Sequence, residues 1–197
     1  MYKQAFIWIG RSGCGKGTQA ALLIDALKKA DASRGVKHIE TGAEMRQFIQ
    51  GQTITQQMAK GITESGGLQP EFIAIYQWTN VLVNQYNGSD HLFFDGSPRK
   101  LEEAAALDSI FPFYGIEKPW IMYLEVDPEE IHKRLLKRGR KDDTLEGINR
   151  RLAWYETDVA PTVNFYRTSP EHRFLEVNGV GTVEAIHAEI LKKVGLG

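Results

Sequence analysis

The most restrictive feature of the sequence is a glycine-rich stretch near its start, IGRSGCGKGTQA at residues 9–20. The apolar residues Phe6 to Ile9 precede it and predict a buried strand, whereas KGTQAALLIDALKKA after it has the apolar spacing of a helix. Glycines let a backbone wrap closely around an anion, and a helix that begins there adds its positive end. A strand, a glycine loop and a helix in this order predict an α/β fold with a phosphate site after the first strand.

The loop departs at one position from the common phosphate-binding pattern. In that pattern G-x-x-x-x-G-K is followed directly by Ser or Thr, whose hydroxyl binds Mg²⁺. Here Gly10, Gly15 and Lys16 match, but Gly17 comes next and Thr18 follows one position late. Because position 17 offers no side chain to the metal, we expect phosphates, water and a more distant acid to hold Mg²⁺.

The acid expected to orient that water is Asp95, the last residue of the apolar stretch HLFFD. The carboxyl ends of parallel strands meet at one edge of a sheet, and ligands of α/β proteins bind there. Lys16 adds a positive charge near the outer phosphates of a bound nucleotide. The loop is therefore predicted to bind a nucleoside triphosphate with Mg²⁺, and a glycine-rich turn beside a surface lysine is the alternative.

The rest of the chain alternates apolar strands with helical patterns. Strands are predicted at residues 3–9, 37–40, 91–95, 120–126 and 173–177. This alternation predicts a parallel sheet with helices on both faces, and 197 residues with 42% hydrophobic content suffice for one core. Residues 41–70 hold two short helical patterns without a strand, so an insertion that moves as a unit is expected there.

Two prolines predict helix boundaries. Pro70 is expected in the first turn of the helix that continues to Tyr86, where its missing N–H does no harm. The helical pattern over residues 143–160 is expected to end at Pro161.

Bulk properties exclude several classes of protein. The net charge of −1 draws the chain neither to nucleic acid nor to membrane, and no apolar run could span a bilayer. The start of the chain lacks the pattern of a signal peptide. Cys14 is the one cysteine, so no intramolecular disulfide forms, and we expect a monomer in the cytoplasm. Cys14 is either a reactive thiol or a small residue that fills the loop. The five histidines lack the spacing of metal ligands.

Further motifs occur in an order that resembles the adenylate kinase family of nucleoside monophosphate kinases. The loop has that family's form G-x-x-G-x-G-K-G-T, and TGAEMR at residues 41–46 is similar to its T-G-D-M-L-R, with Ala43 in place of Asp. DGSPR at residues 95–99 is similar to D-G-F-P-R, with Ser97 in place of Phe. GGLQPEF, RLLKRGRKDD and INRRL are similar to later segments, so the resemblance covers nearly the whole chain.

The resemblance implies one kinase domain over residues 1–197, built like a P-loop NTPase on a parallel five-stranded sheet. Within it, residues 41–70 would be the insertion that binds the nucleoside monophosphate, and residues 138–143 a vestigial lid. The implied reaction transfers the γ-phosphoryl group of Mg²⁺-bound ATP to AMP and gives two ADP.

The resemblance also assigns the site residues. It places ATP against Gly13, Cys14, Gly15, Lys16, Gly17, Thr18, Arg134 and Arg138. It places the monophosphate against Thr41, Arg46, Leu68, Gln69, Gly96, Arg99, Glu103, Arg140 and Arg151. The catalytic group is Lys16, Arg99, Arg138, Arg140 and Arg151, and Asp95 holds Mg²⁺ through water. Several cations suit this reaction because it brings the negative charges of two nucleotides together. Planar guanidinium groups position the phosphates and neutralise their charge.

Two features depart from the family. Gly139 alone separates Arg138 from Arg140, so the lid is nearly absent, a lid zinc site is excluded, and water could reach the reacting phosphate. Asp142 and Asp143 beside these arginines either anchor them by ion pairs or cap the next helix.

The second departure is Glu103, which stands where the family has a Gln that reads the acceptor adenine. It either faces the acceptor base or lies on the surface of its helix. The alternatives to an AMP kinase are a kinase for GMP or a pyrimidine monophosphate and a non-catalytic nucleotide-binding regulator. The regulator has no need for the arginines expected on the transferred phosphate.

Overall fold

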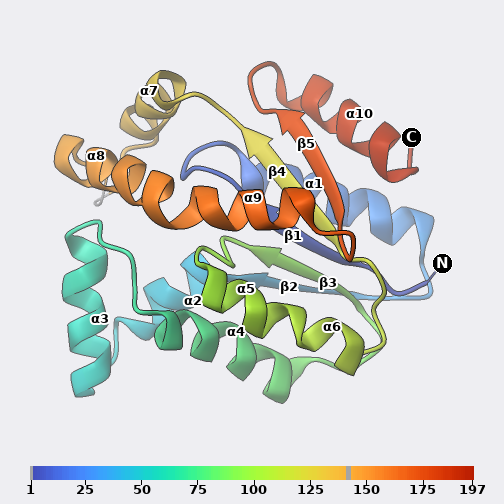
Figure 1. Cartoon of the computed structure of the whole chain (residues 1–197), viewed down its shortest axis with the longest axis horizontal. Helices are drawn as coiled ribbons and strands as arrows, with labels where there is room; N and C mark the ends of the chain where they lie inside the picture. Colours follow the sequence, from blue (N-terminus) through green and yellow to red (C-terminus); the bar gives the residue numbers. More distant parts are fainter. Residues whose placement is uncertain (1, 141–142) are drawn as a thin grey trace.

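The structure, a computed structural model, describes residues 2–140 and 143–197 and is built on a five-stranded parallel sheet. The strands are β1 (Ala5–Ile9), β2 (Val36–Glu40), β3 (His91–Asp95), β4 (Trp120–Glu125) and β5 (Arg173–Asn178). They lie side by side in the order β2-β3-β1-β4-β5 (Figure 1). Each predicted strand is present, and the predicted fold of a P-loop NTPase is confirmed.

Helices cover both faces of the sheet because side chains along a strand alternate between them. From β1, Phe6 and Trp8 pack on one face, and Ala5, Ile7 and Ile9 pack on the other. The first face is covered by α1 (Lys16–Ala30), α7 (Pro128–Arg138), α8 (Leu145–Trp154) and α10 (Val183–Val194). The second is covered by α4 (Glu71–Gln85), α5 (Leu101–Asp108), α6 (Ile110–Phe113), the π-helix η1 (Tyr155–Val159) and α9 (Ala160–Thr168). None of these described helices has the length and apolar character needed to cross a membrane.

Two helices lie between β2 and α4 in the chain. They are α2 (Thr41–Phe48) and α3 (Ile54–Glu64), and α3 lies at the edge of the molecule (Figure 1). Thr53 and Gln56 start α3 with a reciprocal capping box. A small apolar cluster of Met45, Ile49, Ala59 and Ile73 joins these helices to α4. The 41–70 segment thus has its own small core, separate from the two large ones.

The two proline predictions are corrected by the structure. Pro70 is the N-cap residue of α4, one position before its first turn. Pro161 does not end its helix, because α8, η1 and α9 follow one another without a break. The Ala160 N–H bonds to the Tyr155 carbonyl five residues back, so the turn widens just before Pro161. A wide turn accommodates a ring that an ordinary α-helical turn would exclude.

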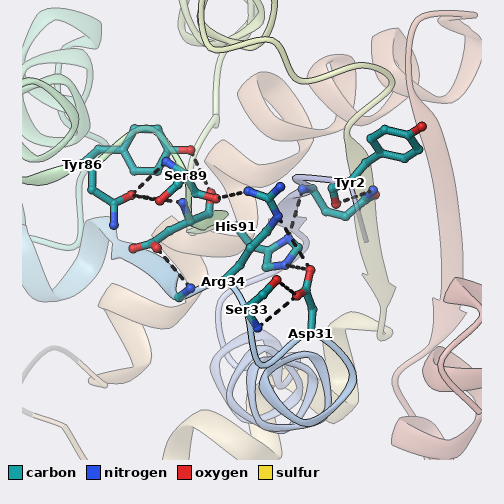
Figure 2. Close-up of polar contacts among 11 residues, drawn as sticks. Tyr2, Asp31, Ser33, Arg34, Tyr86, Ser89 and His91 are labelled. Atoms are coloured by element: carbon teal, nitrogen blue, oxygen red, sulfur yellow. Dashed lines mark hydrogen bonds and ion pairs between the residues drawn. The ribbon is translucent and has the colours of Figure 1, made fainter.

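A polar network lies at the amino ends of the strands (Figure 2). Asp95 lies at the other, carboxyl end of β3. Asp31 follows α1 and accepts hydrogen bonds from the backbone and hydroxyl of Ser33. His91 begins β3 with its side chain fully buried; its Nδ1 accepts the Gln4 N–H at 3.1 Å, and its Nε2 lies 3.4 Å from Asp31. Arg34 donates to the Ser89 carbonyl at 2.8 Å. These contacts tie the end of α1 to the start of β3.

Candidate active site

The glycine loop leaves the start of α1 open to an anion. Gly10 has a φ of 146°, and a Cβ there would lie 2.7 Å from the Leu124 carbonyl oxygen. Gly15, with a φ of 107°, is the N-cap residue of α1, and no side chain caps the helix. The first N–H groups of a helix lack intrahelical partners, so here they are available to a phosphate.

Lys16 folds back over the loop that precedes it. Its Nζ donates to the carbonyls of Gly10 at 2.9 Å and Arg11 at 3.0 Å. Cys14 beside it is 1% exposed and packs in the apolar cluster that contains Trp8. This burial favours the packing role of Cys14 over the reactive thiol, because reactive cysteines are partly exposed.

Gly17 makes room for Asp95. A Cβ at Gly17 would lie 3.2 Å from the Asp95 Oδ2, so the carboxylate approaches the backbone at the start of α1. Burial raises the pKa of Asp95, and the positive charge of Lys16 opposes that rise. A carboxylate beside a phosphate loop can accept hydrogen bonds from the water molecules of hydrated Mg²⁺. Thr18, the displaced hydroxyl residue, is exposed on α1.

Two cavities lie at this edge of the sheet. The smaller, about 60 Å³, is lined by Lys16, Gly96 and Arg99 among others. The larger, about 990 Å³, is lined by eight of the residues predicted for the monophosphate: Thr41, Arg46, Leu68, Gln69, Arg99, Glu103, Arg140 and Arg151. Six residues predicted for ATP line neither cavity: Gly13, Cys14, Gly15, Gly17, Thr18 and Arg134. The larger cavity is called the acceptor cleft below.

Asp143 gathers the arginines that follow α7. Its side chain is fully buried and accepts two hydrogen bonds from Arg138, both at 2.8 Å, and one from Arg151 at 2.7 Å. It also accepts the backbone N–H of Arg140 at 3.1 Å. Burial opposes its ionisation, but these hydrogen bonds and charges lower the pKa of Asp143. Asp143 therefore anchors the arginines, while Thr144 caps α8 by accepting the Gly147 N–H.

The two adjacent arginines of α8 go to different places. Arg151 is 8% exposed and lines the acceptor cleft, whereas Arg150 bonds to Glu146 on the outer surface. Asp142, the other predicted anchor, lies outside the described residues. Arg134 donates to the carbonyls of Cys14 at 3.3 Å and Gly179 at 3.0 Å, so its guanidinium lies against the loop.

Arg99 connects the acceptor cleft to α8. Its Nε donates to the Gly96 carbonyl at 2.8 Å, and its guanidinium lies 5.5 Å from the Trp154 ring centre. Trp154 in turn donates to the Gly66 carbonyl at 3.2 Å. A Cβ at Gly66 would lie 3.0 Å from the Gly147 Cα, so the 41–70 segment meets α8 backbone to backbone.

Glu103 is buried, so the alternative that it lies on the surface of its helix is wrong. It is 1% exposed, and its Oε2 accepts the Arg99 N–H at 3.0 Å. Its Oε1 has no hydrogen-bond partner within the described parts of the chain. Burial raises the pKa of Glu103.

Sequence reasoning missed Arg11. It donates to the Val126 carbonyl at 3.1 Å and to Glu156 at 2.6 Å, and it stacks 4.2 Å from the Tyr155 ring centre. Arg11 thereby ties the glycine loop to η1. The loop pattern leaves its position open to any residue, so no local signal could have identified the role. Trp154 was also missed, and Ser97, which accepts a hydrogen bond from the Thr41 hydroxyl, was noted only as a departure from the family motif.

Comparisons with known proteins identify the family. Residues 8–171 match the family model for adenylate kinase. The chain belongs to the adenylate kinase family. It is 34% identical to the adenylate kinase of Parabacteroides distasonis over 94% of both chains. It is 33% identical to adenylate kinase 1 of a Nostoc species, over 96% of this chain and 97% of the relative.

Membership of the adenylate kinase family identifies the class of activity. The chain is a phosphotransferase of the nucleoside monophosphate kinase class. The alternative of a non-catalytic regulator is not favoured.

Proposed function

We propose that the protein transfers the γ-phosphoryl group of Mg²⁺-bound ATP to AMP and releases two ADP. One observation carries this proposal: cations from separate parts of the chain converge between the glycine loop and the 41–70 segment. They are Lys16, Arg99, Arg138, Arg140 and Arg151. Phosphoryl transfer requires such positioning and neutralisation of charge and little covalent chemistry from the protein.

The glycine loop takes the donor. The free N–H groups at the start of α1 bind the ATP phosphates, and Lys16 leaves the loop carbonyls to reach the outer phosphates. Asp95 would hold the water shell of Mg²⁺, which neutralises phosphate charge when bound. Arg134, whose guanidinium lies against the backbone of the loop, would border the adenine, as the resemblance to the family implies.

The acceptor cleft takes AMP. Arg46 and Arg99 bind its phosphate, and Arg46 leaves its 3.0 Å contact with Glu40 to do so. Arg138 and Arg151, anchored by Asp143, stabilise the charge on the transferred group. An oxygen of the AMP phosphate attacks the γ-phosphorus, the bond to the bridging oxygen breaks, and the electron pair leaves with ADP.

Further parts of the assignment follow from this reaction. Residues 41–70 are the segment that closes over AMP, and residues 138–143 are a shortened lid within one kinase domain. The protein works as a monomer in the cytoplasm, and its single cysteine, which excludes an intramolecular disulfide, fits a reducing compartment.

Lys16→Met tests the proposal. We expect turnover to fall by about 10²-fold or more, as when a transition-state donor is removed. The assay couples ADP formation to NADH oxidation, with ATP, Mg²⁺ and in turn AMP, GMP, CMP, UMP and dTMP. Lys28→Met is the matched control, because Lys28 is exposed on the same helix. Unchanged turnover in Lys16→Met would refute the assignment of the loop.

A further inference from the structure

Trp154 lies between two parts of the structure that the proposed function assigns to the acceptor. It is the last residue of α8 and lines both the acceptor cleft and the smaller cavity. Its indole N–H bonds to the backbone of the 41–70 segment, and its ring contacts Arg99. One side chain therefore joins α8 to the segment that would close over AMP and to an arginine that would bind its phosphate.

The indole N–H holds the turn that ends α3. Its Nε1 donates to the Gly66 carbonyl at 3.2 Å. The Gly66 N–H in turn donates to the Thr63 carbonyl at 3.0 Å. The next N–H, that of Gly67, donates to the Ile62 carbonyl at 2.9 Å. Because these backbone bonds tie the turn to the last residues of α3, a hydrogen bond to the turn restrains the end of the helix as well.

The indole ring holds the guanidinium of Arg99. That group lies over the ring, 5.5 Å from its centre, while its Nε donates to the Gly96 carbonyl at 2.8 Å. A guanidinium is attracted to the face of an indole, and this contact takes up none of its N–H donors. A carboxylate in the same place would bond to those donors and compete with a phosphate. The ring therefore orients Arg99 while its Nη groups can still donate to a ligand.

We infer that Trp154 is a positioning residue for the acceptor. It orients Arg99 toward the acceptor phosphate and holds the 41–70 segment against α8, without touching the reacting atoms. The inference rests on the proposed function, because it needs the phosphate of AMP to bind at Arg99. Neither contact is made to the glycine loop, so losing them should raise the KM for AMP and leave the KM for ATP nearly unchanged.

Two substitutions separate the two contacts. Trp154→Phe keeps an aromatic ring and removes the N–H, and it should raise the KM for AMP by about threefold to tenfold, as expected for one lost hydrogen bond. Trp154→Leu removes the ring as well and should raise the KM by about a further threefold. The coupled assay with AMP and ATP varied in turn measures both KM values and kcat, which should change less than the KM for AMP.

Trp120 offers a matched control. It is half-buried like Trp154, and the guanidinium of Arg173 lies 5.2 Å from its ring centre. It lies in β4 and lines neither cavity. Trp120→Phe and Trp120→Leu should therefore leave the KM for AMP at the wild-type value, whatever they do to Tm.

A double-mutant comparison tests whether the ring acts through Arg99. In the wild-type background kcat/KM for AMP should be about threefold higher in Trp154→Phe than in Trp154→Leu. In the Arg99→Lys background this ratio should shrink toward one, because lysine has no planar group for the ring to orient. An equal ratio in both backgrounds would refute action through Arg99.

Amide hydrogen exchange tests the other contact without any turnover. In the full-length protein without nucleotide, the Gly66 and Gly67 amides should exchange about threefold to tenfold faster in Trp154→Phe than in the wild type. The amides of α4 should be unchanged, and Trp120→Phe should show no difference at either place. Unchanged exchange of the Gly66 and Gly67 amides would refute the hold on the 41–70 segment.

The outcomes separate this inference from the proposed function. Failure of the wild type to phosphorylate any monophosphate would refute the proposed function and the inference with it. Phosphorylation of AMP by a wild type whose Trp154 variants match the Trp120 variants in KM and exchange would refute the role of Trp154 alone. Equal rises in the KM for AMP and the KM for ATP would also refute it, because the effect would not be confined to the acceptor.

Discussion

Replacement of Asp143 by alanine should weaken the fold and the site together. The side chain is fully buried and accepts four hydrogen bonds, three of them from the guanidinium groups of Arg138 and Arg151. Removing one partner of a buried ion pair typically costs about 3–5 kcal/mol. Arg138 is 28% exposed and finds water again, so we expect the lower end, about 3 kcal/mol. For a chain of this length that lowers Tm by about 6–12 °C.

The same substitution should reduce catalysis. Arg138 and Arg151 lose the acceptor that fixes their side chains, and misplaced positioning groups cost about 100-fold. We expect kcat/KM for AMP to fall by that amount at a temperature where the variant remains folded. Urea denaturation measures the stability change, and the coupled assay measures kcat/KM.

Glu146→Ala is the matched control for Asp143→Ala. It removes an acid that also bonds to an arginine, but this Glu side chain is 82% exposed. Exposed pairs on a helix contribute about 0.3–0.5 kcal/mol, so both stability and activity should be nearly unchanged. If Asp143→Ala matched this control in both assays, Asp143 would not anchor the arginines.

Two further predictions concern water and pH. Since α7 ends at Arg138 and α8 begins at Leu145, ATP hydrolysis without acceptor should exceed that of a long-lid adenylate kinase, as phosphate release would reveal. Equal rates would mean that the site is sealed without a long lid. Burial lowers the pKa of His91, so its contribution to stability is present above about pH 6.5 and declines as pH falls through the unfolded pKa. The Tm of His91→Asn should depend less on pH between 8 and 5 than that of the wild type, and equal slopes would contradict the argument.

The sequence predicted those elements whose signals are local. The stretches that became β1 and β3 are short and apolar, and the glycine loop follows β1 directly, so strand, loop and helix could be placed from a few residues. Pro161 misled the prediction because a proline normally ends a helix. The helix continues because the turn at η1 is wide, and no pattern of residues in the sequence predicts such a turn.

Candidate site residues could be named where a local pattern marks them, and not where their placement depends on distant packing. Lys16 was named from the loop pattern and Arg99 from the resemblance of DGSPR to the family's motif, and their roles stay predictions. The sequence left open whether Asp143 anchors the arginines by ion pairs or caps the next helix, because it does not reveal whether the carboxylate is buried. The burial of Glu103 depends on how α5 meets α4 and α9, contacts between segments far apart in the chain.

The contact of Gly66 with α8 has a consequence for how the two substrates communicate. The 41–70 segment touches α8 through bare backbone, with a Cβ at Gly66 only 3.0 Å from the Gly147 Cα. Arg151 lies one helical turn beyond Gly147, on the same face of α8. If residues 41–70 move when a monophosphate binds, as proposed, we expect the movement to reach α8 and the proposed phosphate-binding Arg151 through this backbone contact and the Trp154 hydrogen bond to Gly66. In such an enzyme, we expect occupancy of one substrate site to be sensed at the other through these contacts of Gly66 with α8.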